Sequence, residues 1–180
     1  MVFIILGNGY EEAEAIIPFD ILVRGGVDVR FVSTNTSPFV QGAHGFSFKA
    51  DYVVQNVIIT KEDTILIPGG MGGVQSIMKN VNAMDLISDG EHRGTILSAI
   101  CAGPSVLAKL GFLDGKNITC YPGCEHLMGN AVCHTELPVC EDGKIITGRA
   151  VGSAIEFALT LLASIKGKEQ ADKVRQEIVY

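Results

Sequence analysis

Cys101 is the residue whose surroundings point most directly to chemistry. It follows the apolar run from Thr95 to Ile100 and precedes Ala102-Gly103-Pro104, a pattern typical of a buried strand that turns directly into a helix. A helix N-terminus carries partial positive charge, which can lower the pKa of a thiol from about 8.5 to between ~3.5 and ~7.5. We therefore predict that Cys101 is a thiolate nucleophile. The alternative is a buried cysteine that only packs.

A second group of chemistry-bearing side chains lies between positions 120 and 134 and consists of Cys120, Cys124, His126, Cys133 and His134. Their spacing, C-x3-C-x-H-x6-C-H, matches no common structural zinc pattern, and Cys120 lies in an apolar stretch. We therefore expect no bound metal, and a zinc site is the alternative.

The elements that position these residues alternate between short apolar runs and helical patterns. This alternation predicts an α/β fold, a mostly parallel sheet with helices on both faces. The predicted strands are residues 2–6, 27–33, 64–67, 95–100 and 117–121. Residues 138–147 predict a hairpin, and residues 39–48 predict a short hairpin or an irregular excursion. The predicted helices are residues 11–24 with a kink at Pro18, 82–92, the segment after Cys101 to Leu110, Ser153 to near Gly167, and 168–179. Ser153 and Glu156 fit a capping box.

Three loops are expected to meet at the carboxyl edge of the sheet, where open α/β folds bind ligands. They are Gly7 to Glu14, Pro68 to Gly73 and Cys101 to Pro104. The Pro68 to Gly73 loop is rich in glycine, which indicates a backbone that another group approaches closely.

Composition narrows the class of protein. The 180 residues are 47% hydrophobic and 19% charged, so we expect one domain over residues 1–180. The net charge of −6 and the 14 scattered Lys and Arg residues argue against a nucleic-acid partner. The apolar start ends at Gly7 without a basic segment, so we expect no export signal, no membrane span and a cytoplasmic location. Five cysteines in such a chain favour reduced thiols.

Four segments resemble motifs of the ThiJ/PfpI superfamily and, within it, the DJ-1-like branch. They are Gly9 to Ala15, Ile67 to Gly70, Ala99 to Pro104 and Asp142 to Thr147, in similar order and spacing over nearly the whole chain. The resemblance implies a flavodoxin-like three-layer sandwich, usually a homodimer, whose reactive cysteine sits on a strained nucleophile elbow.

By the same matching, Cys101 takes the place of the reactive cysteine, and Glu14 that of a protonated acid that donates to the thiolate. The backbone amides of Gly70 and Ala102 take the place of oxyanion donors. The physical argument agrees, because a carboxylate beside a thiolate would put two negative charges in one pocket, so the carboxyl keeps its proton. Such a group is a general acid and base. The alternative for this acidic segment is that it only complements a helix dipole.

The sequence departs from the superfamily pattern beside the pocket. Aldehyde-processing members carry a histidine where this chain has Tyr121, so the third catalytic partner is absent or replaced by Tyr121 or His126. The segment Arg149-Ala150-Val151-Gly152 stands where Arg-Gly-Pro-Gly is more usual. Peptidase members carry a histidine directly after the cysteine, where this chain has Ala102, which argues against proteolysis.

The resemblance and the residues together predict a cofactor-independent enzyme similar to glyoxalase III or the proposed protein deglycases, with a small aldehyde or glycated substrate. The alternative is an oxidative-stress sensor or chaperone-like homodimer that acts through oxidation of Cys101. A glutamine amidotransferase would use His134-Thr135-Glu136, but Pro104-Ser105 does not match its elbow. A purely structural domain would leave the glycine-rich loop unexplained.

Overall fold

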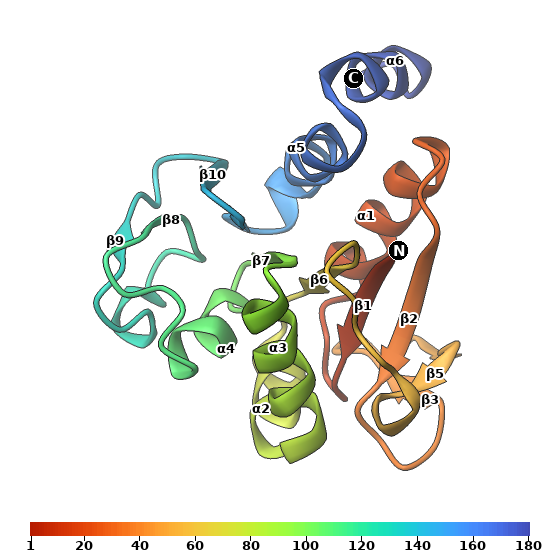
Figure 1. The fold of residues 1–180 in the computed structure, drawn as a ribbon, viewed down its shortest axis with the longest axis vertical. Helices are drawn as coiled ribbons and strands as arrows, with labels where there is room; N and C mark the ends of the chain where they lie inside the picture. The colour runs from red at the N-terminus through yellow and green to blue at the C-terminus, as the bar shows by residue number, and fades with distance from the viewer.

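A seven-stranded sheet runs through the middle of the computed structural model, which describes residues 1–180 (Figure 1). The strand order is β10-β11-β7-β6-β1-β2-β5. All neighbouring strands are parallel except the β10–β11 pair, which is an antiparallel hairpin. The strands are β1 (Val2–Leu6), β2 (Val29–Ser33), β5 (Tyr52–Val53), β6 (Thr64–Ile67), β7 (Ile96–Ile100), β10 (Val139–Asp142) and β11 (Ile145–Gly148).

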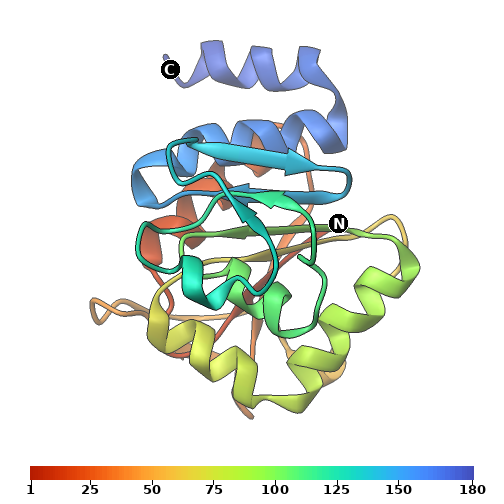
Figure 2. The same ribbon diagram turned by 90° about the vertical axis from the view of Figure 1, so that its left-hand side faces the viewer.

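Helices cover both faces of the sheet, as the predicted α/β sandwich requires (Figure 1 and Figure 2). Helices α1 (Glu12–Arg24) and α5 (Ala154–Lys166) lie on one face, and α6 (Lys168–Glu177) packs outside α5. Helices α2 (Met71–Lys79), α3 (Val81–Arg93) and α4 (Pro104–Lys109) lie on the other face.

Both faces of the sheet are apolar because side chains alternate along each strand and helices cover both sides. Along β1, Val2, Ile4 and Leu6 belong to the core under α1 and α5. Phe3 and Ile5 belong to the core on the opposite face. The near-continuous apolar strands of the sequence are therefore explained by burial on both sides.

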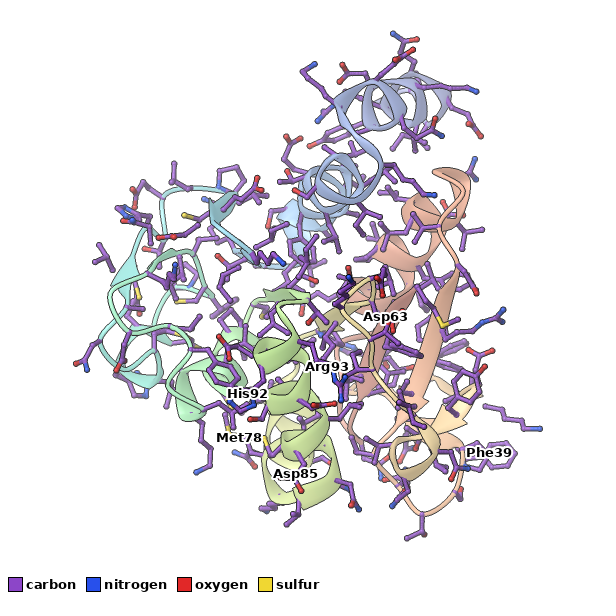
Figure 3. The ribbon with its side chains drawn as sticks, in the orientation of Figure 1. Phe39, Asp63, Met78, Asp85, His92 and Arg93 are labelled. Atoms are coloured by element: carbon purple, nitrogen blue, oxygen red, sulfur yellow. The ribbon has the colours of Figure 1, made fainter.

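Smaller elements lie outside the main sheet. Strands β3 (Phe39–Gln41) and β4 (Ser47–Lys49) form a hairpin, from which Phe39 projects outward with 62% of its surface exposed (Figure 3). Strands β8 (Asn117–Ile118) and β9 (Val132–Cys133) form a short parallel ladder of their own. The 3₁₀ turns are η1 (Val54–Asn56), η2 (Glu125–Leu127) and η3 (Val151–Ser153). None of the helices has the length and apolar character needed to cross a membrane.

The structure confirms most of the predicted elements. The strands predicted at residues 2–6 and 64–67 and both hairpins are present. Helix ends differ from the predicted ones by a few residues, and the helix after Cys101 begins at Pro104. Helix α1 is continuous through Pro18.

The glycine-rich segment from Pro68 to Gly73 was predicted to be all loop, and this was wrong, because α2 begins at Met71. No helix was predicted over residues 71–79, because glycine is a poor helix former and Gly72 and Gly73 fall in its first turn. Packing explains these glycines, since a Cβ at Gly73 would lie 2.7 Å from the Cα of Tyr10. Close contact between α2 and the loop after β1 therefore outweighs helix propensity.

Two further local predictions were wrong. The strand predicted at residues 117–121 is only the two-residue β8, because the Thr119 amide donates to the Thr147 hydroxyl at 2.8 Å instead of extending a ladder. Ser153 does not cap α5 with its side chain. Its hydroxyl bonds the backbone of Ala150, while Glu156 pairs with Arg175 at 3.1 Å.

Candidate active site

The carboxyl ends of three adjacent strands, β1, β6 and β7, bring the predicted site residues together. The Glu11 amide donates to the Gly69 carbonyl at 3.0 Å, and the Gly69 amide donates to Oε2 of Glu14 at 2.8 Å. A Cβ at Gly69 would lie 2.5 Å from that oxygen and 3.0 Å from Sγ of Cys101. Gly69 therefore lies between the carboxyl and the sulfur, and no larger residue fits there.

Cys101 stands on a strained turn between β7 and α4. Its φ of 65° is in the left-handed region, which costs a non-glycine residue about 1–3 kcal/mol. Hydrogen bonds hold this conformation, from the Cys101 amide to the Gly148 carbonyl at 2.9 Å and from the Tyr121 amide to the Cys101 carbonyl at 3.0 Å. A Cβ at Gly103 would lie 2.4 Å from the Ile67 carbonyl oxygen, so the turn also needs glycine there. The geometry is that of a nucleophile elbow.

Glu14 lies on α1 with its side chain completely buried. Burial raises the pKa of its carboxyl from 4.5 to about 7, while hydrogen bonding with Cys101 and with the amides of Gly69 and Val151 opposes the rise. Oε1 makes no hydrogen bond within the usual distance limits. A carboxyl that titrates near neutrality can hold or release a proton during a reaction.

The sulfur environment differs from the one predicted. Burial and the Glu14 carboxylate raise the pKa of the Cys101 thiol, and the amides of Ala102 and Gly70 only partly oppose this. The predicted lowering by a helix N-terminus is outweighed because the sulfur is largely removed from water and faces the Glu14 carboxylate. Cys101 and Glu14 are so close that their protons titrate as one coupled system.

The two predicted backbone donors both lie at the sulfur. Hydrogen bonding from the Ala102 and Gly70 amides lowers the pKa of Cys101. Gly70 has a φ of 80°, and a Cβ there would lie 2.4 Å from the Gly9 carbonyl oxygen. This position therefore demands glycine both for its backbone conformation and for its packing.

Tyr121 and His126 make no side-chain hydrogen bond with Cys101 or Glu14. Tyr121 is 50% exposed and contributes its backbone amide to the elbow. The His126 ring lies 3.0 Å from the Gly123 carbonyl oxygen and lines a cavity of about 500 Å³ together with Met71 and Ser105. The participation of Tyr121 or His126 in place of the missing histidine stays a prediction.

Sequence reasoning missed two contributions to the site. The Gly69 amide binds Glu14, although only the neighbouring Gly70 was predicted as a donor. The backbone of Val151, in the segment that departs from the usual pattern, also opposes the rise in the pKa of Glu14, although no hydrogen bond from it falls within the usual distance limits. The Gly-Gly pair was a visible signal for the first contact. No side-chain pattern reports the second, because the donor is a main-chain group.

A pair of charged side chains beside the site was also not predicted. His44, in the β3–β4 hairpin, lies 2.7 Å from Glu12 through its Nδ1 and 3.7 Å from Glu11. These contacts raise the pKa of His44. Burial alone would raise the pKa of Glu12, but the hydrogen bond from the imidazole outweighs it, so the pKa of Glu12 is lowered. The negative charge of Glu11 in turn raises the pKa of Glu14, so Glu11 lies within electrostatic reach of the site.

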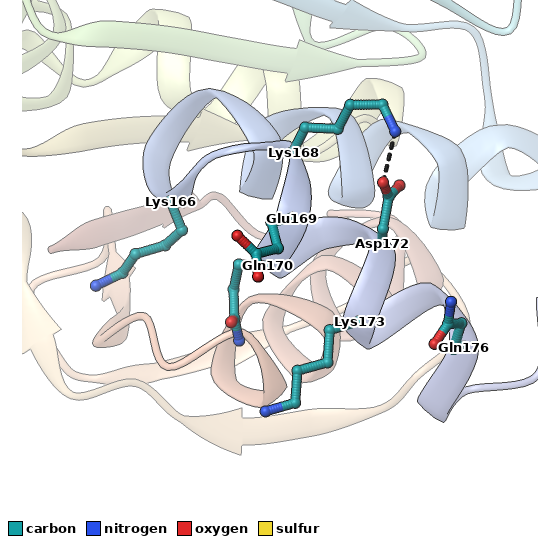
Figure 4. Close-up of a pocket in the computed structure, with 7 residues that line it drawn as sticks. All are labelled: Lys166, Lys168, Glu169, Gln170, Asp172, Lys173 and Gln176. Carbon is teal, nitrogen blue, oxygen red and sulfur yellow. Dashed lines mark hydrogen bonds and ion pairs between the residues drawn. The ribbon is translucent and has the colours of Figure 1, made fainter.

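The cysteines and histidines between positions 120 and 134 do not form a metal-ligand group. The group of His, Cys and acidic side chains whose ligand atoms lie within 4.8 Å of one another is Glu11, Glu12 and His44. A separate cavity of about 840 Å³ along α6 is lined by charged and amide side chains and contains no thiol (Figure 4). Neither feature resembles the enclosed nucleophile and acid at Cys101.

Fold and site together define an α/β protein with a cysteine on a nucleophile elbow. The profile of the DJ-1/PfpI family matches residues 1–164, and the chain belongs to that family. Protein dj-1beta of Drosophila melanogaster is 34% identical over 177 residues, which cover 98% of this chain and 95% of that protein.

Two further relatives are informative. The glutathione-independent glyoxalase DJR-1.2 of Caenorhabditis elegans is 30% identical over 165 residues, covering 91% of this chain and 87% of that protein. The structure of oxidized Toxoplasma gondii DJ-1 superposes with a TM-score of 0.90 at 31% identity, covering 99% of this chain and 97% of that one. The fold is thus shared over the whole length with proteins of this family.

Proposed function

We propose that this protein is a cofactor-independent enzyme that converts small reactive dicarbonyl compounds, such as methylglyoxal, into hydroxy acids, and that it resembles glyoxalase III and the deglycases. One observation carries the proposal. A strained cysteine, a buried carboxyl that titrates near 7 and two backbone donors converge on one point. The glyoxalase named among its relatives, at 30% identity, supports the same reaction class.

The chemistry begins with the shared proton of Cys101 and Glu14. Above pH 7 the pair carries one negative charge, because both groups cannot ionise together in one buried pocket. As the sulfur approaches the aldehyde carbon, Glu14 holds the proton, and a carbon–sulfur bond forms in a hemithioacetal. The amides of Gly70 and Ala102 stabilise the oxyanion that develops, and Glu14 then protonates it.

The second half of the reaction moves a proton between neighbouring carbons. The Glu14 carboxylate removes the proton from the carbon bonded to sulfur, which gives an enediol, and returns it to the adjacent carbon. The hydroxyl proton of the hemithioacetal passes to the neighbouring oxygen, which leaves a thioester of a hydroxy acid. Water then cleaves the thioester and restores the Cys101 thiol. The overall change is addition of water to methylglyoxal to give lactate, with no external oxidant or reductant.

A direct assay tests the proposal. Purified protein is incubated with methylglyoxal without glutathione, and lactate is measured over time. We expect that Cys101→Ser abolishes lactate formation, that Glu14→Gln reduces it at least about 100-fold as expected for loss of a general acid and base, and that Cys140→Ser leaves it unchanged. Lactate formation that survives Cys101→Ser, or none with the unsubstituted protein, refutes the proposed activity.

A redox-sensing role is the second candidate, and a specific observation favours it. Cys101 is only partly buried, and its sulfur already receives hydrogen bonds from two backbone amides that can also hold oxidised sulfur oxygens. An oxidized form of a Toxoplasma gondii relative has been solved. Mild peroxide treatment followed by mass spectrometry is expected to modify Cys101 before the other thiols. Equal modification of all cysteines would argue against this role.

A further inference from the structure

Three cysteines outside the proposed active site gather near the short β8–β9 ladder. Cys120 is completely buried, Cys124 is buried, and Cys133 is partly exposed. All three pack against the same hydrophobic core. The reaction proposed at Cys101 uses none of them.

The ladder places two of these thiols on the same face. Strands β8 and β9 are parallel, with Ile118 opposite Cys133. The side chains of Ile118 and Cys120 lie in the same core, and Cys133, which is in register with Ile118, packs against that core. Cys120 and Cys133 are therefore neighbours, close enough for each thiol to affect the pKa of the other. Cys124 lies in the turn beyond Tyr121, and Cys133 has no effect on its pKa.

The two thiols are unequal. Burial raises the pKa of both, and the neighbouring thiol adds to the rise at Cys120 but partly offsets it at Cys133, so Cys133 bears the developing negative charge more easily. Cys133 is also the partner that reaches solvent, whereas Cys120 has no exposed surface. An oxidant from solution therefore meets Cys133 first, and Cys120 is the thiol next to it.

We propose that Cys120 and Cys133 form a reversible disulfide when the protein is oxidised by hydrogen peroxide. The sulfur of Cys133 attacks one peroxide oxygen, the oxygen–oxygen bond breaks, and water leaves as Cys133 becomes a sulfenic acid. The sulfur of Cys120 then attacks that of Cys133, a sulfur–sulfur bond forms, and a second water leaves. Two thiols are oxidised and one peroxide is reduced to two waters, and a small dithiol reverses the change.

The disulfide would act on the segment that supports the elbow. Cys120 lies directly before Tyr121, whose amide donates to the Cys101 carbonyl, and directly after Thr119, whose amide donates to the Thr147 hydroxyl. A disulfide from Cys120 to Cys133 would therefore link the segment that holds the Cys101 turn to strand β9. The linkage needs no turnover at Cys101, so it is independent of the proposed enzymatic function.

Peptide mapping tests the linkage. The full-length protein is treated with hydrogen peroxide under native conditions, alkylated, and digested with trypsin and Glu-C, which cleaves after Glu125 and separates Cys120 from Cys133. We expect the fragments carrying these two residues to appear joined, with the loss of two hydrogen atoms. Dithiothreitol is expected to release them and to restore both thiols to alkylation.

Matched variants identify the partners. Cys124→Ser should retain the joined fragments, Cys120→Ser and Cys133→Ser should lose them completely, and Cys101→Ser should form them as the unsubstituted protein does. A link from Cys133 to Cys124, or oxidation of Cys133 to sulfinic acid while Cys120 stays free, overturns the proposal. Because Cys120 and Cys124 lie on the same fragment, fragment-ion sequencing of the joined peptides from the unsubstituted protein identifies the linked cysteine even where a variant does not fold.

Discussion

Replacing Glu14 with glutamine should change how the stability of the protein depends on pH. The carboxyl is buried, and its pKa is raised from 4.5 to about 7 in the folded state. Below pH 4.5 the folded and unfolded chains both hold this proton. Between pH 4.5 and 7 only the folded chain keeps it, so the folded state loses stability as the pH rises, and the loss is complete above 7. Glu14→Gln removes this dependence because the amide does not titrate.

The magnitude follows from the shift in pKa. Each pKa unit corresponds to ~1.4 kcal/mol, so the contribution of Glu14 to the free energy of unfolding falls by roughly 2–3 kcal/mol between pH 5 and pH 8. Urea unfolding of both proteins at these two pH values measures it, and taking the difference between the proteins cancels the other titrating groups. An equal pH dependence for both proteins would refute the raised pKa of Glu14 and the proton-holding role built on it.

Four further outcomes are expected. Gly69→Ala should lower the free energy of unfolding by about 1–3 kcal/mol and reduce lactate formation, because the new Cβ would lie 2.5 Å from Glu14 Oε2. Unchanged urea unfolding would contradict this. Glu12→Gln should lower the pKa of His44 because it removes the charge that raises it, which NMR titration of the imidazole detects. Phe157→Ala should cost about 3–5 kcal/mol, measured by urea unfolding, because this ring is completely buried. Light scattering should give the mass of a homodimer, and a monomer mass would contradict the expected assembly.

The parts of the fold that could be predicted are those whose signal is local. The apolar runs that became β1 and β6 are buried on both faces, so every residue in them is hydrophobic or small, and the signal is continuous. The start of α2 could not be predicted, because Gly72 and Gly73 oppose helix formation. These glycines leave space for the loop near Tyr10, where a side chain would clash with the backbone. Similarly, β8 is cut short by the Thr147 hydroxyl, a partner 28 residues away.

The residues of the candidate site also divide into those with a local sequence signal and those without one. The strand, the cysteine and the glycines of the elbow are contiguous in sequence, so their arrangement could be predicted from Thr95 to Pro104 alone. The backbone of Val151 near Glu14 and the contact of His44 with Glu12 could not, because Val151 and His44 come from segments distant in sequence. Main-chain donors carry no residue-type signal at all.

The amino-acid sequence by itself determined which groups reach the carboxyl edge of the sheet, since strand order along the chain and the positions of Cys101, Glu14 and Gly70 follow from local patterns. Only the tertiary structure decided how those groups share charge. Desolvation depends on every atom packed around a group, and here it raises the pKa values of both Cys101 and Glu14 more than the nearby backbone amides lower them. A helix N-terminus predicted from the sequence gives only one contribution, which lowers the pKa of Cys101. In the folded protein, burial and the neighbouring Glu14 carboxylate raise that pKa.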